Sequence, residues 1–365
     1  MESPVMLSIA AGLSRDAYER VCQIFFERFN AAGFAILERP MAQFYAAISG
    51  SQLSGVVVDI DRHHTDVSPV IDGFVASAAR SSVPLGLDDC LAYLAHLFRA
   101  NTSVMAALSP PDNPPAPEAL QETLLALARH VWQSGLIKAL AEGEAARDLD
   151  DEGVTDIAAI VVAGKERAVI ESGMKRRANA KAQPAEQARA RELEALDLVT
   201  TDFRGMELTL GKERHRFCEP LFDPALLKGI PGARERSGAD ADLMRPVQTL
   251  VGEAVAKTDV DQRTYIWQGL LVTGEITTHI KGGSSRKFCT ISICLTLVLP
   301  AGLGAALSGR LAPYILSAPD VANNEVQPRS IKTLKVPDYF AEYRDKGDGL
   351  AAFLGTSIIA KVRCD

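Results

Sequence analysis

Residues 56–73 read VVVDIDRHHTDVSPVIDG, and this stretch has the pattern of a β-hairpin. A β-branched run leads into Asp59, a polar turn follows, and a second short strand ends before a glycine. Hairpins that bind phosphate need glycines in the turn, because only glycine lets the backbone N–H groups approach an anion at unusual φ. Here the turn carries Asp61, Arg62 and His63 instead. The stretch predicts a hairpin and leaves three interpretations open: a nucleotide site, a degenerate one, or an ordinary polar turn.

The composition is that of a globular protein large enough for more than one core. The chain has 365 residues, of which 47% are hydrophobic. Its formal net charge of −7 argues against a protein that coats nucleic acid, so contact with DNA or nucleosomes is expected only through partners. The six cysteines form no C-x-x-C pair and no zinc spacing, which predicts no metal site and a reducing compartment, cytosol or nucleus.

One uncharged run raises the question of a membrane span. Residues 288–309 read FCTISICLTLVLPAGLGAALSG, which is the length that a transmembrane helix needs. Pro300, Gly302 and Gly304, together with several serines and threonines, disfavour a span. We therefore expect no membrane association.

Strand and helix patterns alternate through the first hundred residues. Ser14 precedes an amphipathic pattern that runs to Phe29, which predicts a helix. Residues 87–99 predict another helix, with acids early in it as the helix dipole prefers. Between them the sequence predicts strands over GFAILE (33–38) and SGVVVDI (54–60), and a helix over PMAQFYAAIS (40–49). This alternation predicts an α/β fold.

The middle of the chain changes character twice. Residues 109–117, SPPDNPPAP, predict a proline-rich loop, and residues 118–140 predict a helix. Residues 142–196 are rich in Ala, Glu, Arg and Lys, which is typical of an exposed helix or a flexible insertion. Its basic cluster is either a solvated helix face or a nuclear-import or partner-binding patch; it comprises Lys175, Arg176, Arg177 and Lys181.

The last third of the chain returns to short structural patterns. ELTLGKERHRFCEPLFDP (207–224) predicts a strand, a Gly-Lys turn and a second strand. GLLVTGEITTHIKG (269–282) predicts a buried strand that ends in a glycine loop. SIKTLKVP (330–337) predicts a strand, and DGLAAFLGTSIIAKV (348–362) a glycine turn and a helix.

Several of these pieces, in this order, resemble the actin and actin-related protein family. The first 30 residues resemble the family's strand and helix ending in Phe-Asn, and DIDRHHTDVSPVIDG lies where the family has its second phosphate loop. GKERHRFCEPLFDP is similar to a diagnostic family hairpin, VTGEITTHIKG to the adenosine-side glycine loop, and DGLAAFLGTSIIAKV to the terminal turn and helix. The resemblance implies an α/β, actin-like two-lobed fold of the actin, Hsp70 and sugar-kinase ATPase type.

The resemblance also shows two departures. The start of this chain is similar to a point inside the family fold, so we expect the N-terminal part of the first lobe, with the first phosphate loop, to be missing. Either the gene model is truncated or the protein is a shortened form. Removing residues 283–302 joins HIKG to LGAALSGRL and restores the family pattern, which indicates an insertion such as translated intron. The expected division is residues 1–85 in the first lobe, 86–280 in the second, with 142–196 inserted, and 303–365 returning to the first.

The phosphate loop implied by the resemblance is degenerate. Asp59 keeps the family's first aspartate, whereas Asp61 replaces a glycine, Arg62 the second aspartate and His63 the other glycine. A carboxylate in the cradle repels phosphate, and an arginine cannot coordinate a divalent cation. Adjacent His63 and His64 point to opposite faces of a strand, so they do not form a metal pair.

Three further positions point the same way. Trp132-Gln133 stand where the resemblance places a Lys-Glu pair that contacts the nucleotide. In Gly274-Glu275, the glutamate replaces the second glycine of the adenosine-side loop. Arg39-Pro40 lie near the position of the family's catalytic glutamine, and neither can replace it. We therefore expect no catalytic residue, no bound cofactor and no ATP turnover.

Among the family's branches, the chain most resembles the nuclear actin-related proteins of fungal SWI/SNF and RSC chromatin remodellers. This implies a non-catalytic nuclear subunit that pairs with another actin-related protein and docks on the helical HSA segment of a SNF2-type ATPase. Such a helix would lay an apolar stripe on hydrophobic surface. The candidate lining, with core positions as the alternative interpretation, is Tyr339, Phe340, Tyr343 and Phe353.

Two other interpretations compete. The first is a genuine ATP-binding actin-related protein of cytoskeletal or motor-adaptor type, which Arg62 and His63 disfavour. The second is a nonfunctional product of a defective gene model.

Overall fold

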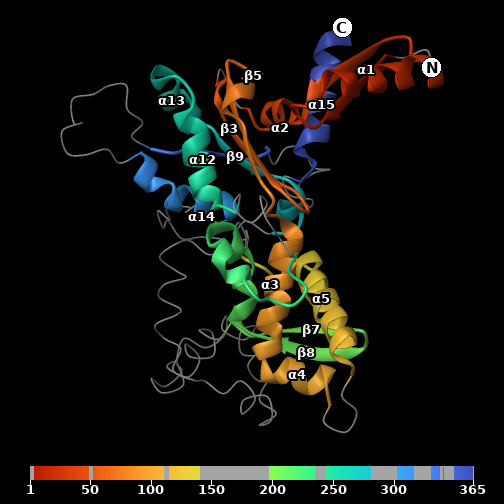
Figure 1. Ribbon diagram of the computed structural model, residues 1–365, viewed down its shortest axis with the longest axis vertical. Helices are drawn as coiled ribbons and strands as arrows, with labels where there is room; N and C mark the ends of the chain where they lie inside the picture. Colours follow the sequence, from red (N-terminus) through yellow and green to blue (C-terminus); the bar gives the residue numbers. More distant parts are fainter. Residues whose placement is uncertain are drawn as a thin grey trace, which may run out of the picture. The chain divides into compact units, whose positions relative to one another are not determined.

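The computed structural model describes residues 4–48, 52–110, 115–139, 197–234, 244–280, 302–315, 330–337, 340 and 349–364 (Figure 1). The predictions for residues 142–196 and 283–301, including the basic cluster, lie outside these ranges. The chain divides into two compact units, and each is described by itself. Unit 1 comprises Met1–Leu87 and Arg236–Asp365, and unit 2 comprises Asp88–Glu235.

A mixed sheet forms the centre of unit 1. Its strand order is β10-β9-β3-β4-β5, with β6 paired to β4. β3 runs parallel to β9, which runs parallel to β10, whereas β4 is antiparallel to its neighbours β3, β5 and β6. The strands are β3 (Gly55–Ile60), β4 (Thr65–Ile71), β5 (Phe74–Val75), β6 (Ser81–Val83), β9 (Leu270–Thr273) and β10 (Thr333–Leu334). The α/β fold and the hairpin predicted for residues 56–73 are confirmed.

Helices cover both faces of this sheet because β3 is apolar on both sides. All residues of β3 are buried, as expected for a strand paired on each side within a covered sheet. On one face, Phe44 of α2 packs against Val57 and Leu271, and α15 packs against α2. α12 contacts β3 and β4, and Figure 1 shows it on the other side of these strands. The helices are α2 (Arg39–Ala47), α12 (Val247–Ala256), α13 (Val260–Trp267), α14 (Leu303–Arg310) and α15 (Ala351–Cys364).

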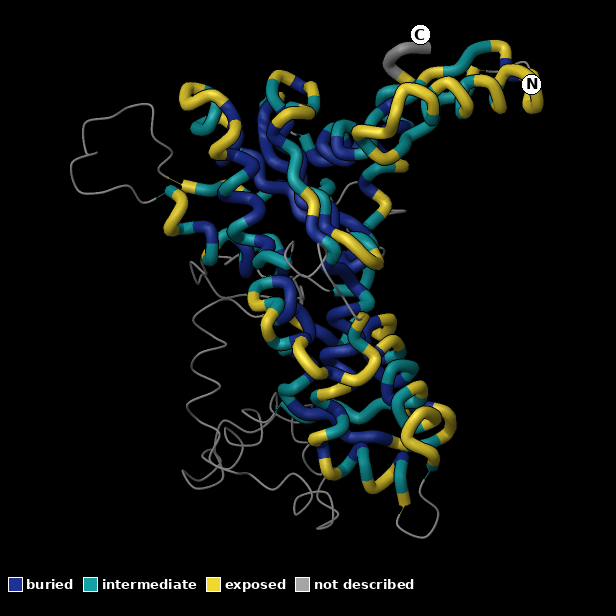
Figure 2. Tube along the Cα trace, viewed as in Figure 1, coloured by how far each residue is buried: buried dark blue, intermediate teal, exposed yellow. Residues whose placement is uncertain are grey.

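The N-terminal part of unit 1 is a second, smaller layer. β1 (Val5–Ile9) and β2 (Phe34–Glu38) form a two-stranded parallel sheet, joined by α1 (Arg15–Gln23) and the π-helix η1 (Ile24–Arg28). Ser14 caps α1, and its hydroxyl accepts the N–H of Ala17 at 3.3 Å, which confirms the predicted helix start. Phe25 stacks on Phe34 at 4.3 Å, but α1 and η1 bury none of their residues completely (Figure 2).

The uncharged run at residues 288–309 ends inside α14. Leu303, Ala306 and Leu307 of this helix are buried, and α14 contacts β9. Among the residues that the structure describes, no helix is long and apolar enough to cross a membrane.

Unit 2 is built from helices around one β-hairpin. The hairpin joins β7 (Val199–Phe203) to β8 (Met206–Leu210), antiparallel in register from Val199 with Leu210 to Phe203 with Met206. The helices are α3 (Leu87–Ala100), α4 (Thr102–Leu108), α5 (Pro117–Gln133) and α10 (Glu219–Phe222), with the short 3-10 turns η3 (Lys212–Cys218) and η4 (Pro224–Leu227). The predicted helix over residues 87–99 is confirmed, and the one over 118–140 ends earlier, at Gln133.

The predicted second strand after Gly211 is wrong. β8 pairs with β7, which precedes it, and residues 212–218 form the 3-10 helix η3. The reason is local hydrogen bonding: the Glu213 carboxylate accepts the Gly211 N–H at 3.0 Å, and the Arg214 side chain donates to the Gly211 carbonyl. Backbone groups that a strand ladder would use are thereby taken by side chains.

The observed units also differ from the expected lobes at one boundary. The expected boundary at residue 86 is close to the observed boundary at Leu87. Residues 244–280, however, lie in unit 1 and not in the second lobe. The cause is strand pairing, because β9 adds to β3 with Val56 opposite Leu270 and Asp59 opposite Thr273. Long-range strand pairing of this kind leaves no local signal in the sequence.

We predict that Gly355→Ala destabilises unit 1. A Cβ at Gly355 of α15 would collide with the backbone carbonyl of Ala42 in α2, so the two helices would have to separate. We expect a loss of about 1–3 kcal/mol of unfolding free energy, measured by denaturant titration. Gly304→Ala in α14 is the matched control, because its Cβ would meet atoms only at ordinary distances, from 3.7 Å. Equal stability of the two variants would contradict this account.

Candidate functional site

The hairpin turn between β3 and β4 is the candidate site. Asp59 lies opposite Asp66 and Ile60 opposite Thr65, and the Asp61 N–H donates to the His64 carbonyl at 2.9 Å. The turn is therefore closed by its own backbone. At its base, the hydroxyl of buried Thr65 donates to a backbone carbonyl at 2.7 Å.

The first residue of α2, Arg39, points its guanidinium at this turn. Its Nε lies 2.8 Å from Asp59 Oδ2 and its Nη2 lies 3.2 Å from Asp59 Oδ1, a two-point contact. Its Nη1 donates to Asp61 Oδ2 at 3.0 Å. One guanidinium thus joins both carboxylates of the turn through the fork geometry that arginine offers.

The environment shifts the three pKa values in different directions. Burial raises the pKa of the Asp59 carboxyl, and this outweighs the opposing charge of Arg39. Burial would also raise the pKa of Asp61, but the hydrogen bond and charge of Arg39 outweigh it, so that pKa is lowered. Burial opposes the charged form of Arg39 as well, yet the facing carboxylates, Asp59 first, raise its pKa. The three groups therefore depend on each other to carry charge.

A second ion pair joins the turn to the loop after β9. Arg62 Nη2 lies 2.8 Å from Glu275 Oε1, with the arginine side chain 56% exposed. Glu275 follows Gly274, whose φ of +104° and close approach to the backbone of Ile60 require glycine. The predicted buried strand is confirmed as β9, and after Gly274 the chain forms the 3-10 helix η5 (Glu275–Thr278), whose first residue contacts the hairpin turn.

The histidines of the turn do not form a metal site. His63 is exposed, and His64 Nε2 lies 3.2 Å from Asp66 Oδ2. In the described part of the chain, no group of three or more His, Cys, Asp or Glu could hold a metal ion.

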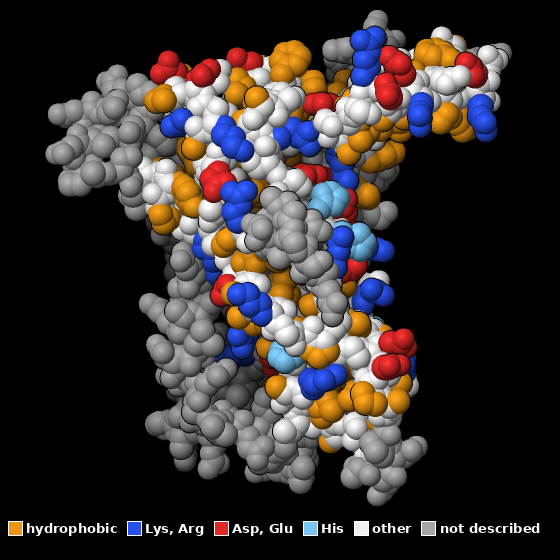
Figure 3. Space-filling view, viewed as in Figure 1, with side chains coloured by type: hydrophobic (Ala, Val, Ile, Leu, Met, Phe, Trp, Pro, Cys, Tyr) orange, Lys and Arg blue, Asp and Glu red, His pale blue; other side chains and the backbone are white. Residues whose placement is uncertain are grey.

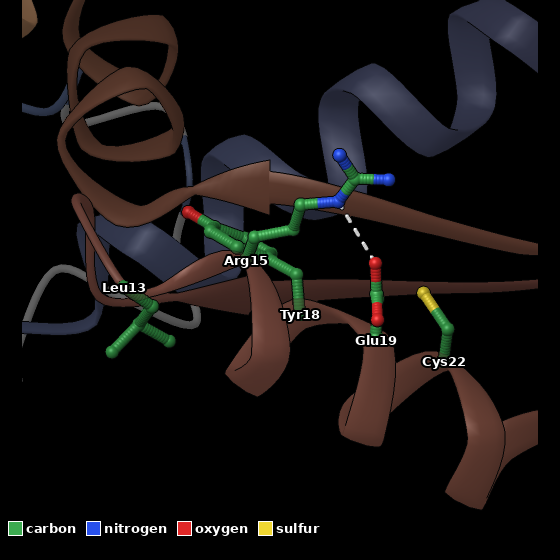
Figure 4. Close-up of a pocket in the computed structure, with 5 residues that line it drawn as sticks. All are labelled: Leu13, Arg15, Tyr18, Glu19 and Cys22. Carbon is green, nitrogen blue, oxygen red and sulfur yellow. Dashed lines mark hydrogen bonds and ion pairs between the residues drawn. The ribbon is translucent and has the colours of Figure 1, made fainter.

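A separate groove lies along α1. It has a volume of about 510 Å³ and is lined by Leu13, Arg15, Tyr18, Glu19 and Cys22. Arg15 Nε lies 2.9 Å from Glu19 Oε1, and Figure 4 shows this ion pair as a dashed line. None of these residues belongs to the hairpin or to its charged partners, so the groove is no part of the candidate site.

Comparison with known proteins places this geometry in a family. The family model described as Actin matches residues 1–113, which include the whole hairpin and Arg39. Residues 1–113 therefore match an actin-family domain. The predicted resemblance and the actin-like fold are thereby confirmed.

Individual relatives extend the likeness along the chain. The chain is 25% identical to the Schizosaccharomyces pombe protein "SWI/SNF and RSC complexes subunit arp9" over 98% of its own length and 66% of that protein. It is 21% identical to actin-related protein 4 of Arabidopsis thaliana over 75% of this chain and 55% of that protein. Against actin-related protein 3 of Saccharomyces cerevisiae it is 33% identical, over 24% of this chain and 22% of that protein. The chain thus spans less than two thirds of the length of each of these relatives.

Trp132-Gln133 and the GKERHRF motif of unit 2 lie in or beside its core. The Trp132 side chain is 5% exposed within the core at the end of α5, and Gln133 beside it is exposed. Arg214, in the motif GKERHRF, is 1% exposed and donates to the carbonyls of Leu136 at 3.0 Å and Asp197 at 2.6 Å. A charge so deeply buried is tolerated because each of the three guanidinium nitrogens of Arg214 has an acceptor.

Asp197 is the acidic partner of this motif. Its Oδ2 lies 2.8 Å from Arg214 Nη2 and 2.8 Å from His215 Nε2. Because His215 Nδ1 accepts the N–H of Lys138 at 3.1 Å, the imidazole carries its proton on Nε2, facing Asp197. Burial, the largest influence, lowers the pKa of His215, so a neutral ring donates this hydrogen bond.

The aromatic residues predicted to line a partner surface fall into different environments. Phe340 packs against the cluster of Ala46, Ala351 and Leu354, so it contributes to the core. Phe353 of α15 is 64% exposed. Tyr339 and Tyr343 lie outside the described residues. Figure 3 shows hydrophobic side chains exposed among charges around α1 as well, where Phe26 and Phe29 are half exposed.

Sequence reasoning missed the role of Arg39. It was singled out only as a residue that cannot replace a catalytic glutamine. Its partners Asp59 and Asp61 lie 20 and 22 residues away, beyond the reach of any helical or strand periodicity. A basic residue that begins a helix was the one available signal, because the helix dipole disfavours a cation there without a compensating anion.

We predict that Asp197→Asn removes stability in a pH-dependent way. Burial opposes the charge of Asp197, but the hydrogen bond of His215 and the charge of Arg214 outweigh it, so the folded pKa is lowered. The stabilisation is therefore present above the unfolded pKa of about 3.9 and lost as pH falls through the folded pKa.

At pH 7 the variant should lose on the order of 1–2 kcal/mol, limited by solvent screening because a third of the side chain is exposed. Asparagine tolerates the left-handed backbone of this position, φ +42°, so the change reports on charge. Unfolding titrations from pH 7 to pH 2 should show the two proteins converging in acid. A difference that does not shrink would contradict the assignment.

Proposed function

We propose that this protein is a non-catalytic structural subunit of a nuclear chromatin-remodelling complex of the SWI/SNF or RSC type. The observation that carries the proposal is the likeness to the S. pombe subunit of both complexes over 98% of this chain. The actin-family match and the confirmed actin-like fold support it. The nucleus is the compartment in which such a complex acts.

We further propose that the chain pairs with another actin-related protein and docks on the helical HSA segment of the remodeller's ATPase subunit. An amphipathic helix docks by burying apolar anchors in a hydrophobic surface. Phe353, on the outer side of α15, is the described aromatic residue suited to this contact, since 64% of it is exposed. Contact with DNA or the nucleosome would then be indirect, through these partners.

Loss of ATP turnover is the second part of the proposal. A phosphate cradle needs backbone N–H groups that approach the anion, and it needs carboxylates free to organise a cation. In this chain Asp59 and Asp61 are both paired with Arg39, and Glu275 faces the turn on the glycine-loop side. This arrangement supports a protein that works without a nucleotide cofactor. An ATP-binding actin-related protein of cytoskeletal or motor-adaptor type is the alternative that the nucleotide measurement below distinguishes.

We predict that affinity purification of the tagged full chain, from nuclear extract of the organism that encodes it, recovers remodeller subunits. Mass spectrometry would identify them. Phe353→Ala should reduce the recovered ATPase subunit about tenfold, the effect of losing roughly 1.4 kcal/mol at an aromatic anchor. Phe74→Ala is the matched control, because Phe74 is 70% exposed on β5 and outside the proposed contact. Recovery of cytoskeletal proteins without remodeller subunits would contradict the proposal.

We predict that the purified protein shows no saturable ATP binding up to about 1 mM in the presence of Mg²⁺, measured by calorimetry and by thermal shift. The physical reason is that both carboxylates, Asp59 and Asp61, are already bonded to Arg39. Actin-family ATPases measured in parallel serve as the positive control. A Kd in the micromolar range would support the alternative function.

A further inference from the structure

We propose that the Arg39 guanidinium is a built-in counter-ion that holds the hairpin turn in its folded geometry without any nucleotide or metal ion. This deepens the proposed non-catalytic function, on which it rests, by naming what stabilises the site in place of a ligand. The proposal stands on three observations: the position of Arg39 in α2, the burial of Asp59, and the second ion pair on the other side of the turn.

The position of Arg39 is unfavourable unless the carboxylates compensate it. Arg39 begins α2, and the N-terminal end of a helix carries partial positive charge that repels a cation. No side chain caps this end of α2, and Pro40 follows as a residue suited to the first turn. The arginine gains instead from the three contacts to Asp59 and Asp61, at 2.8, 3.2 and 3.0 Å. The contacts with Asp59 and Asp61 therefore explain why an arginine stands at this position, which neither the helix dipole nor N-capping favours.

Asp59 in turn depends on Arg39. It lies at the end of the central strand β3 with 6% of its surface exposed, where an unpaired carboxylate is strongly disfavoured. Arg39 contacts both of its oxygens, and the buried Gln43 adds a hydrogen bond. Asp61 and Asp66 place further negative charge nearby, and both act to raise the pKa of Asp59. Arg39 is the cation bonded to this acidic turn from α2.

The opposite side of the turn is neutralised separately. Arg62 pairs with Glu275 at 2.8 Å, which ties the turn to the loop that begins at Gly274. Asp59, Asp61 and Glu275 thus each bond to an arginine of the same chain, and Asp66 lies 3.2 Å from His64 Nε2. Because one guanidinium bonds two carboxylates of the turn, Arg39 is a positioning residue for the β3–β4 connection.

The test compares the thermal stability of full-length variants in buffer that contains a chelator and no nucleotide. Arg39→Met keeps an unbranched apolar stem and removes the guanidinium with its charge. We expect its Tm to fall by roughly 6–12 °C, because it leaves a buried carboxylate without a counter-ion. Arg15→Met is the matched control: Arg15 is also ion-paired, to Glu19 at 2.9 Å, but its side chain is 90% exposed, so its Tm should change by no more than about 2 °C.

Rescue by charge removal separates electrostatics from packing. The triple variant Arg39→Met, Asp59→Asn, Asp61→Asn no longer needs a counter-ion, and we expect it to recover at least half of the lost Tm. If Arg39→Met alone fails to fold, a folded triple variant gives the same support. A wild-type Tm for Arg39→Met, or a triple variant no more stable than the single one, would overturn the proposal.

The outcomes are distinguishable from those that test the proposed function. Failure to recover remodeller subunits would reject the assignment to a complex and leave the stability result intact. Conversely, an unchanged Tm in Arg39→Met would reject the counter-ion and leave membership of the complex unaffected.

Discussion

The pairing of β3 on both of its edges is the constraint on which unit 1 depends. β4, from adjacent sequence, pairs along one edge, and β9, more than 200 residues later, pairs along the other. This second pairing places Gly274 and Glu275 beside the hairpin turn and carries α12 and α13 onto the sheet. It also buries Asp59 at the end of the strand, since every residue of β3 is enclosed. The fold therefore creates a buried carboxylate that has to be neutralised.

Arg39 meets that requirement from a different element. The helix α2 packs its Phe44 on the same sheet, so its first residue is held at the level of the turn. The apolar face of α2 thus fixes where the guanidinium lies, and the guanidinium allows the acidic turn to form. Unit 2 also contains a buried charged group that needs partners. The guanidinium of Arg214 is bonded to Asp197 and to backbone carbonyls. In both units an arginine–aspartate contact with one buried partner, Asp59 or Arg214, joins segments that sequence patterns describe only as polar.

Local patterns predicted a large part of the architecture correctly. The capped start at Ser14, the hairpin at residues 56–73 and the helix from Leu87 all depend on neighbouring residues, and each was confirmed. The segment after Gly211 was predicted as a strand and forms a 3-10 helix, because side-chain bonds from Glu213 and Arg214 replace the strand ladder. The boundary at residue 280 differed because strand pairing across the sequence is not a local property. For the candidate site, the degenerate residues Asp61, Arg62 and His63 were visible in sequence, but their partners were not.

By itself, the sequence determined the α/β class, the likeness to the actin family and the loss of turn glycines, because these follow from residue types at fixed local spacing. The tertiary structure alone decided how the acids of the turn are neutralised. Arg39 reaches Asp59 through the packing of α2 on the sheet, and Glu275 reaches Arg62 through the pairing of β9 with β3. Charge pairs formed across 20 and more than 200 residues have no periodicity, so only the folded chain brings them together.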